Sequence, residues 1–259
     1  MELKIGDYVT RKSYQHDVIF KIIKVEGKVY YLKGKNVRLY ADAVLDDLKK
    51  WDEEETIEEK EFLKRIEVES PDRSDYFYLP GKILHIDGDN DYLNRCLKYY
   101  ENTNIWAVGF CECEENMADR MIELLERFNP NIVVITGHDS FNSKMTDKSD
   151  LRNYKNSVYF VNAIKKAREY EDSHEKLIVI AGGCQSNYEE LIKAGANFAS
   201  SPKRVNIHAL DPAIIASRMS LSDINQNIDL KNILEKTKYG SNGMGGIITK
   251  GTMYVGYPR

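Results

Sequence analysis

Long apolar runs are missing from this 259-residue chain, and no stretch approaches the roughly 18 to 20 apolar residues that a membrane-spanning helix needs. The opening residues, MELKIGDYVTRK, contain no apolar core of the kind found in a secretory signal peptide. From these two absences we expect a protein that is made and kept in the cytoplasm and has no membrane partner.

Cysteine and net charge are also low. The four cysteines (Cys96, Cys111, Cys113 and Cys184) do not resemble a disulfide framework in a chain of this length, so a reducing compartment is expected. The formal net charge of −4 gives no reason to expect nucleic acid or acidic lipid as the main partner. Apolar residues at 42% and aromatic residues at 10% are present in the proportions of a folded globular protein.

Residues 1–45 are predicted to form a small β domain. The stretch DVIFKIIKVEGKVYYLKG contains short runs of strand-forming residues separated by turn signals at residues 26–28 and 33–36. We expect a small SH3-like β-barrel. Because residues 1–40 contain nine Lys or Arg and only four acids, a nucleic-acid-binding barrel is one alternative, but a docking or substrate-recruiting domain is favoured.

The composition changes after residue 45. The stretch DDLKKWDEEETIEEKE holds nine acids and three lysines, a balance typical of a solvated helix or linker. We therefore expect a charged linker over residues 46–79, followed by one α/β domain over residues 80–259.

Short apolar runs alternate with helical patterns from residue 80 onward. Strands are expected at 82–86, 104–111, 131–136 and 176–181, helices at 91–102, 115–130, 157–170 and 188–195, and a further strand and helix at 204–210 and 211–220. The strands lack polar alternation, which indicates a parallel sheet covered by helices on both faces. The glycine-rich residues 240–259 are expected to form loops and an edge hairpin.

Two of the predicted strands lead into residues that can carry chemistry. His138 follows the strand at 131–136, and Cys184 follows the strand at 176–181. In an open parallel sheet, functional residues cluster at the carboxyl ends of the strands. Neighbouring strands lie about 4.8 Å apart. If these two strands are neighbours, the imidazole and the thiol can approach closely enough to form a reactive thiolate. The alternative is that both side chains serve packing alone.

The sequence around Cys184 favours an activated thiol. Ser186 and Glu189 have the spacing of a capping box, which predicts a helix that starts within two residues of the sulfur and whose positive end favours a thiolate. Gly182 and Gly183 allow a tight bend and a close approach to substrate. Backbone amides near Gly183 and Cys184 are expected to form an oxyanion hole.

Asp87 and Asp89, in the stretch HIDGDN, follow the strand at 82–86 and are expected at the same edge of the predicted sheet as His138 and Cys184. We expect them to form an acidic pocket that binds a basic substrate side chain, through charge-assisted bonds to arginine. A magnesium site for phosphoryl transfer and an ordinary acidic turn are the alternatives. Cys111 and Cys113 offer a second metal alternative, but zinc usually takes a wider C-x-x-C spacing, and we expect no metal.

The sequences VVITGHD and LIVIAGGCQS resemble the paired blocks of caspase-like cysteine peptidases, in which one apolar strand ends in the catalytic histidine and the next in the catalytic cysteine. His138 and Cys184 are 46 residues apart, close to the roughly 50 found in caspases. Asp139 stands where those peptidases usually have glycine. We assign the backbone of Asp139, with that of Gly183, to the oxyanion site.

A closer resemblance, over nearly the whole chain, is to the bacterial sporulation protease family YabG. It is carried by the N-terminal β domain, by GKILHIDGD and ITGHDS, by the run from 181 to 213 and by the glycine-rich end. The resemblance implies a caspase-like α/β fold and a cysteine endopeptidase that processes spore-coat and germination proteins in the mother cell. It implies cleavage after arginine, with His138 as base, Cys184 as nucleophile and no cofactor.

An arginine preference would make the chain a substrate for its own peptidase activity. The charged linker leads into KRIEVESPDRSDY, and we predict self-cleavage after Arg65 or Arg73 in that stretch. Two other interpretations stay open. Glycines after a strand are also found in flavodoxin-like and cobalamin-binding ligand modules, and the N-terminal β domain would suit a spore assembly protein without enzymatic activity.

Overall fold

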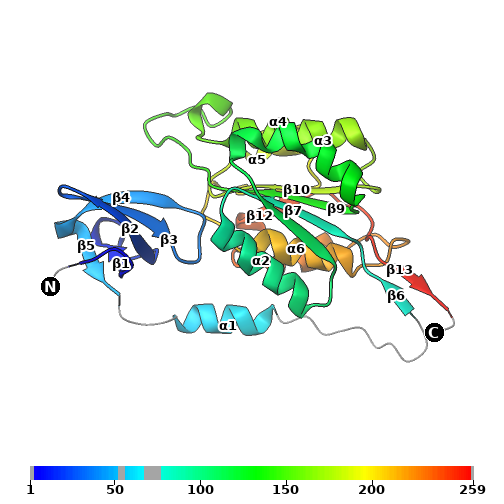
Figure 1. Cartoon of the computed structure of the whole chain (residues 1–259), viewed down its shortest axis with the longest axis horizontal. Helices are drawn as coiled ribbons and strands as arrows, with labels where there is room; N and C mark the ends of the chain where they lie inside the picture. The colour runs from blue at the N-terminus through cyan, green and yellow to red at the C-terminus, as the bar shows by residue number, and fades with distance from the viewer. Residues whose placement is uncertain (1–2, 52–55, 67–76, 258–259) are drawn as a thin grey trace. The chain divides into compact units, whose positions relative to one another are not determined.

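The computed structural model describes residues 3–51, 56–66 and 77–257 (Figure 1). The chain divides into two compact units, Met1–Arg65 and Ile66–Arg259. Within the described ranges, no helix has both the length and the apolar character needed to cross a membrane.

The first unit contains a five-stranded antiparallel sheet in the order β4-β3-β2-β1-β5. Its strands are β1 (Tyr8–Arg11), β2 (Phe20–Glu26), β3 (Val29–Gly34), β4 (Tyr40–Val44) and β5 (Leu48–Lys50). A 3-10 turn at Leu45–Asp47 precedes β5, which returns to pair with β1, so the sheet extends beyond the expected end at residue 45. Fully buried Val9, Phe20, Ile22 and Leu32 belong to its core. Its assignment as an SH3-like barrel stays a prediction.

The expected linker is divided between the two units. Helix α1 (Ile57–Arg65) begins with acidic Glu58 and Glu59 and ends with basic Lys64 and Arg65, so its charges complement the helix dipole at both ends. Strand β6 (Phe77–Leu79) pairs antiparallel with β13 (Tyr254–Gly256), and both strands lie in the second unit.

The second unit is an α/β structure around a six-stranded sheet in the order β12-β11-β10-β9-β7-β8. The strands are β7 (Ile83–Asp87), β8 (Ala107–Cys111), β9 (Ile132–Thr136), β10 (Ile178–Gly182), β11 (Phe198–Ser200) and β12 (Met244–Gly246). β7 to β11 are parallel, and β12 is an antiparallel edge strand. Every residue of β7, β9 and β10 is buried, including the polar His85 and Asp87 of β7, as the lack of regular polar alternation in the sequence predicts.

Helices cover both faces of this sheet (Figure 1). One face carries α3 (Met117–Phe128), α4 (Ser157–Tyr170) and α5 (Tyr188–Lys193), whose apolar side chains join those of the strands in one buried core. The other face carries α2 (Asn90–Asn102) and α6 (Asp211–Ser220), and α7 (Leu230–Glu235) packs beside α6. This α/β arrangement of helices and parallel strands is confirmed, whereas its classification as caspase-like remains a prediction.

Two expectations near the C-terminus were wrong. The strand expected at 204–210 is irregular chain, because the sheet is extended instead by β11, after which Ser201 and Arg204 both adopt left-handed backbone conformations with φ of 62° and 56°. The glycine-rich end supplies β12 and β13 to two different sheets, so it forms an edge strand but no hairpin of its own.

Candidate active site

The strand ends that carry the predicted residues lie side by side. β9 pairs with β7 on one side and with β10 on the other, and the register aligns Asp87, Thr136 and Gly182 at the same edge of the sheet. Immediately beyond, a side chain at Gly183 would collide with the carbonyl oxygen of Gly137 and lie 3.1 Å from the amide nitrogen of Asp139. The loops that follow β9 and β10 therefore contact each other through their backbones, and only glycine fits at 183.

His138 is 6% exposed and lies between two carboxylates. Its Nε2 is 3.7 Å from Oδ2 of Asp89, and its Nδ1 is 3.7 Å from Oε1 of Glu114. The His138 backbone N–H donates to the same Glu114 oxygen at 2.8 Å, and its carbonyl accepts from Asn156 at 2.7 Å. The ring of Tyr92 lies beside the imidazole, with centroids 5.7 Å apart. Both the backbone and the ring of His138 are thus held in place.

Glu114 was missed by the sequence analysis. It begins the short 3-10 turn Glu114–Asn116 that follows β8, and hydrogen bonds from His138 hold its pKa below the usual range although burial acts to raise it. The available signal was the acidic stretch CECEE directly after a predicted strand, since that position shares a sheet edge with the other candidates.

Asp87 and Asp89 are both buried, but they make different contacts. Asp89 is the N-cap of α2, accepting from the amides of Asp91 and Tyr92 through Oδ1, while Oδ2 faces His138. Asp87 is fully buried: Oδ1 accepts from the Asp89 amide at 3.0 Å, and Oδ2 accepts from the Thr136 hydroxyl at 3.0 Å.

A buried polar chain continues from Asp87 into the core. The Thr136 hydroxyl also contacts Nε2 of His85 at 2.8 Å, and Nδ1 of His85 contacts the Tyr100 hydroxyl at 2.9 Å. His85 and Tyr100 are themselves fully buried. The carboxylate of Asp87 is therefore enclosed in the interior, and Asp89 is the slightly more exposed of the two.

Cys184 is fully buried beneath the segment 201–207. The Ile207 N–H donates to its Sγ at 3.4 Å, and the sulfur lies 3.7 Å from the Ile207 carbonyl oxygen. The Gln185 amide bonds the Val205 carbonyl oxygen at 3.1 Å and the Ser201 hydroxyl at 3.0 Å. Residues of this segment therefore contact both the buried thiol and the amide of the residue that follows it.

The predicted capping box was wrong. Asn187, not Ser186, caps the six-residue helix α5, and its side chain accepts from the Glu190 amide. Ser186 is used elsewhere: its hydroxyl accepts from the Gly183 N–H at 2.9 Å and donates to Asp139 at 2.8 Å. The amide of Gly183 is thus already hydrogen-bonded.

Asp139 connects the loop after β9 with the loop after β10 and with the start of α4. Its buried carboxylate accepts from the hydroxyls of Ser157 and Ser186 and from the amides of Ser140 and Asn156. Burial raises the pKa of Asp139, while these four hydrogen bonds act in the opposite direction. Its side chain is structural, so only its backbone is available to an oxyanion.

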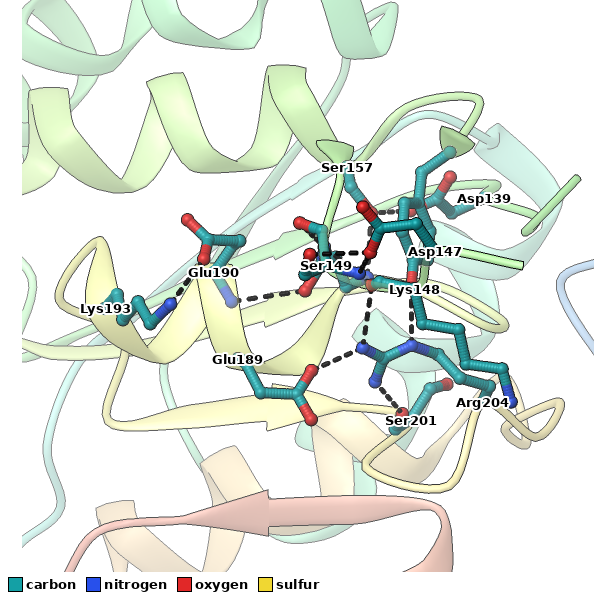
Figure 2. Close-up of polar contacts among 12 residues, drawn as sticks. Asp139, Asp147, Lys148, Ser149, Ser157, Glu189, Glu190, Lys193, Ser201 and Arg204 are labelled. Carbon is teal, nitrogen blue, oxygen red and sulfur yellow. Dashed lines mark hydrogen bonds and ion pairs between the residues drawn. The ribbon is translucent and has the colours of Figure 1, made fainter. Parts of the chain in front are cut away.

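Arg204 anchors the segment that covers Cys184 (Figure 2). Its guanidinium forms an ion pair with Glu189 and donates to the Tyr154 hydroxyl at 2.6 Å and to the Ser201 carbonyl at 3.2 Å. The Arg204 side chain is only 11% exposed. Glu189, predicted to reach back to Ser186, binds Arg204 instead, and this hydrogen-bonded ion pair lowers its pKa although burial opposes the shift.

Four further candidates are Cys111, which pairs with Asp87 in the sheet, Cys113, Arg65 and Arg73. Cys111 and Cys113 are exposed free thiols, and no group of three or more potential metal ligands is found among the residues that the structure describes. Arg65 is the exposed last residue of α1, and Arg73 lies outside the described residues.

The chain matches known proteins over its full length. A family model described as YabG peptidase U57 matches residues 4–70 and 58–258. The chain is also similar to the sporulation-specific protease YabG of Bacillus subtilis (strain 168), with 38% identity over 289 residues that cover 100% of this chain and 99% of that protein. These matches extend over both compact units.

Proposed function

The chain belongs to the YabG peptidase family, and on that premise we propose that it is a cysteine endopeptidase with Cys184 as nucleophile and His138 as general base. Membership makes it a sporulation protease, whose substrates are proteins. We assign it spore-coat and germination proteins as substrates, and the mother cell of a sporulating bacterium as its place of action.

The register of the sheet is the observation that carries this proposal. Thr136 and Gly182 are paired residues of neighbouring parallel strands, and Gly183 packs directly on the backbone of Gly137. His138 and Cys184 each follow these positions by two residues. A nucleophile and a base at adjacent strand ends are what acyl transfer requires.

The reaction then follows the chemistry of a thiol nucleophile. His138 takes the proton of the Cys184 thiol, and the thiolate attacks the carbonyl carbon of the scissile peptide. The C–N bond breaks as the imidazolium gives its proton to the leaving amine. Water, deprotonated by His138, hydrolyses the resulting thioester and releases the acid product and the free thiol.

Opening of the segment 201–207 belongs to this mechanism. The backbone of Ile207 occupies the space beside the sulfur that a scissile peptide needs. Substrate binding must displace it, so the described conformation corresponds to a closed resting state. Gated access of this kind is common where an active site is completed only in the presence of substrate.

The backbone amides of Gly183 and Asp139 are assigned to the oxyanion site. The contacts of Asp139 fix the two loops relative to each other, which favours a preorganised arrangement of donors. At Gly183, the developing oxyanion would replace the Ser186 hydroxyl as partner of the amide.

Specificity for arginine is assigned to Asp89 with the support of Asp87. Asp89 is the less buried of the two, and its Oδ2 lies on the side of His138. Asp87 would act indirectly, by accepting the Asp89 amide and fixing the turn. A carboxylate in a shielded pocket favours arginine through paired, charge-assisted hydrogen bonds.

For the fold we propose a caspase-like second unit preceded by an SH3-like docking domain. The first sheet supports this, because a four-stranded meander is followed by a 3-10 turn and a fifth strand that returns to β1. In the second unit, the support is the placement of His138 and Cys184 after neighbouring parallel strands.

The decisive experiment is mass spectrometry after incubation with an arginyl chloromethyl ketone, which alkylates a reactive thiol with loss of chloride. We expect one adduct, on Cys184, and no adduct on the Cys184→Ala variant. Cys111→Ala is the matched control, because it removes an exposed thiol and should leave labelling intact. Labelling of Cys111 or Cys113 with Cys184 unmodified would overturn the assignment.

A further inference from the structure

Glu114 contacts His138 in two places through one carboxylate oxygen. One oxygen, Oε1, accepts the His138 backbone N–H at 2.8 Å and also lies 3.7 Å from Nδ1 of the ring. The Glu114 side chain is 16% exposed, so this carboxylate is largely shielded from water. A single oxygen therefore contacts both the backbone and the imidazole of the same residue.

The neighbouring strand ends leave room for this carboxylate. Side chains placed at Gly88, after β7, or at Gly137, after β9, would collide with the Glu114 carboxylate. Both positions are glycine, so the acid lies across two adjacent strand ends without obstruction. The contact is thus built by three segments, from β7, β8 and β9, rather than by a chance approach of one surface side chain.

The surroundings of His138 carry negative charge on both sides. Asp89 faces Nε2 and Glu114 faces Nδ1, and the other neighbours, Tyr92 and Asn156, supply a ring and an amide. Asp89 also uses Oδ1 to cap α2, so its position is set by the helix. Glu114 keeps a lowered pKa and remains ionised at neutral pH. The imidazole therefore lies between two carboxylates, one beside each ring nitrogen.

We propose that Glu114 is a positioning residue, which fixes the imidazole of His138 in the orientation that it needs to act on the Cys184 thiol. This inference rests on the proposed function, because it presumes that His138 and Cys184 act together. The role assigned to Glu114 is indirect, since it acts through His138.

The test compares Glu114→Gln with Glu115→Gln in the full-length chain. Glutamine keeps the side-chain oxygen that accepts the His138 amide and removes only the charge. Glu115 is the adjacent, exposed acid and serves as the matched control. For each variant, kcat and KM on an arginyl peptide and the pH dependence of Cys184 alkylation by iodoacetamide are measured.

For Glu114→Gln we expect kcat to fall by about tenfold or more, with little change in KM, because the imidazole loses the charged contact that holds its orientation, and a small misplacement of a catalytic group can reduce turnover about 100-fold. Alkylation of Cys184 at pH 6 should slow by a similar factor, while Glu115→Gln should match the wild type. A Glu114→Gln variant with wild-type kcat and an unchanged alkylation profile would overturn the inference.

A second variant covers the case in which Glu114→Gln does not fold. Glu114→Asp keeps the charge but withdraws the carboxylate by one methylene, and small displacements of a positioned group reduce turnover strongly. We expect a several-fold fall in kcat with Cys184 alkylation less affected than in Glu114→Gln, and an unchanged kcat would refute the positioning role. If Cys184→Ala retains turnover, the proposed function itself fails, which is a different result.

Discussion

Cys184 and His138 are the residues on which the proposed activity depends most directly. Because a nucleophile and its base act as a unit, removing either should cost about as much as removing both. We expect Cys184→Ala to abolish cleavage of a protein substrate and His138→Ala to reduce it by about 10³-fold or more. Steady-state assays with circular dichroism as a folding control check this, and near-wild-type turnover of Cys184→Ala contradicts it.

Asp89 allows a test of specificity that spares the fold. In Asp89→Asn the side-chain oxygen still caps α2, since asparagine is an equally good N-cap, but the charge is lost. We expect kcat/KM for an arginyl substrate to fall about 10- to 100-fold relative to a neutral one, the loss typical of a charged hydrogen bond. The measurement is the ratio between the two substrates, which removes any common effect on His138.

The matched comparison for specificity is Asp87→Asn, because Asp87 is fully buried and contacts the Asp89 amide instead of facing the sheet edge. It should lower thermal stability more and the arginine preference less. An Asp87→Ala, Asp89→Ala double variant that folds and keeps its full preference for arginine would rule out both carboxylates.

Glu114 also makes folding stability depend on pH. Its folded pKa is lowered, so it contributes stability that is present above its unfolded pKa of about 4.3 and is lost as the pH falls through the folded pKa. We expect Glu114→Gln to lower the free energy of unfolding by about 1 kcal/mol at pH 7 and by progressively less on acidification. Urea unfolding across this range tests it, and a difference that stays constant with pH contradicts it.

At the scale of secondary structure elements, the sequence predicts the buried strands well but not the connections between them. β7, β9 and β10 are mainly apolar and buried on both faces, so their lack of polar alternation indicates their place in a parallel sheet. The capping box at Ser186 fails because the Ser186 hydroxyl is used by the Gly183 amide and by Asp139, 47 residues away in sequence, while Asn187 caps the helix.

Glu114 illustrates the same limit at the candidate site. Its contact with His138 depends on β8 lying next to β7, and β7 next to β9, which no local pattern near residue 114 specifies. The positions of His138 and Cys184 beyond neighbouring strand ends could be predicted, because each residue lies two positions after its own apolar strand. The cover over Cys184 depends on left-handed conformations at Ser201 and Arg204, which are uncommon for residues other than glycine and are therefore hard to predict.

The anchoring of segment 201–207 gives a prediction at this scale. Arg204→Gln removes the ion pair with Glu189 and the cation–π contact with Tyr154, whose centroid is 5.5 Å from the guanidinium. We expect the segment to open more often, so that iodoacetamide labels Cys184 several-fold faster. Lys193→Gln is the matched control, because it breaks an exposed ion pair with Glu190 on the same helix. Equal labelling of both variants would show that Arg204 does not hold the cover.

At the scale of the whole molecule, the division into two units gives self-cleavage a defined consequence. Arg65 is the last residue of the first unit and Ile66 the first of the second, so hydrolysis after Arg65 would separate them. Arg65 is exposed at a helix end, where backbone frays most readily. Ile66, however, is buried, and its carbonyl accepts from Tyr99, so a cut there requires local opening. Hydrolysis after Arg73 would release a fragment eight residues longer.

Intact mass spectrometry of purified protein over time distinguishes these outcomes. We expect wild-type chain to lose its N-terminal part after Arg65 or Arg73 and Cys184→Ala to remain whole, because the reaction needs the thiol. Arg65→Gln and Arg73→Gln, made singly and together, identify the bond, since glutamine removes the charge that the proposed pocket would bind. If wild-type protein stays intact while it digests other substrates, or if the double variant is trimmed at the same bond, self-cleavage after arginine is wrong although the endopeptidase assignment stands.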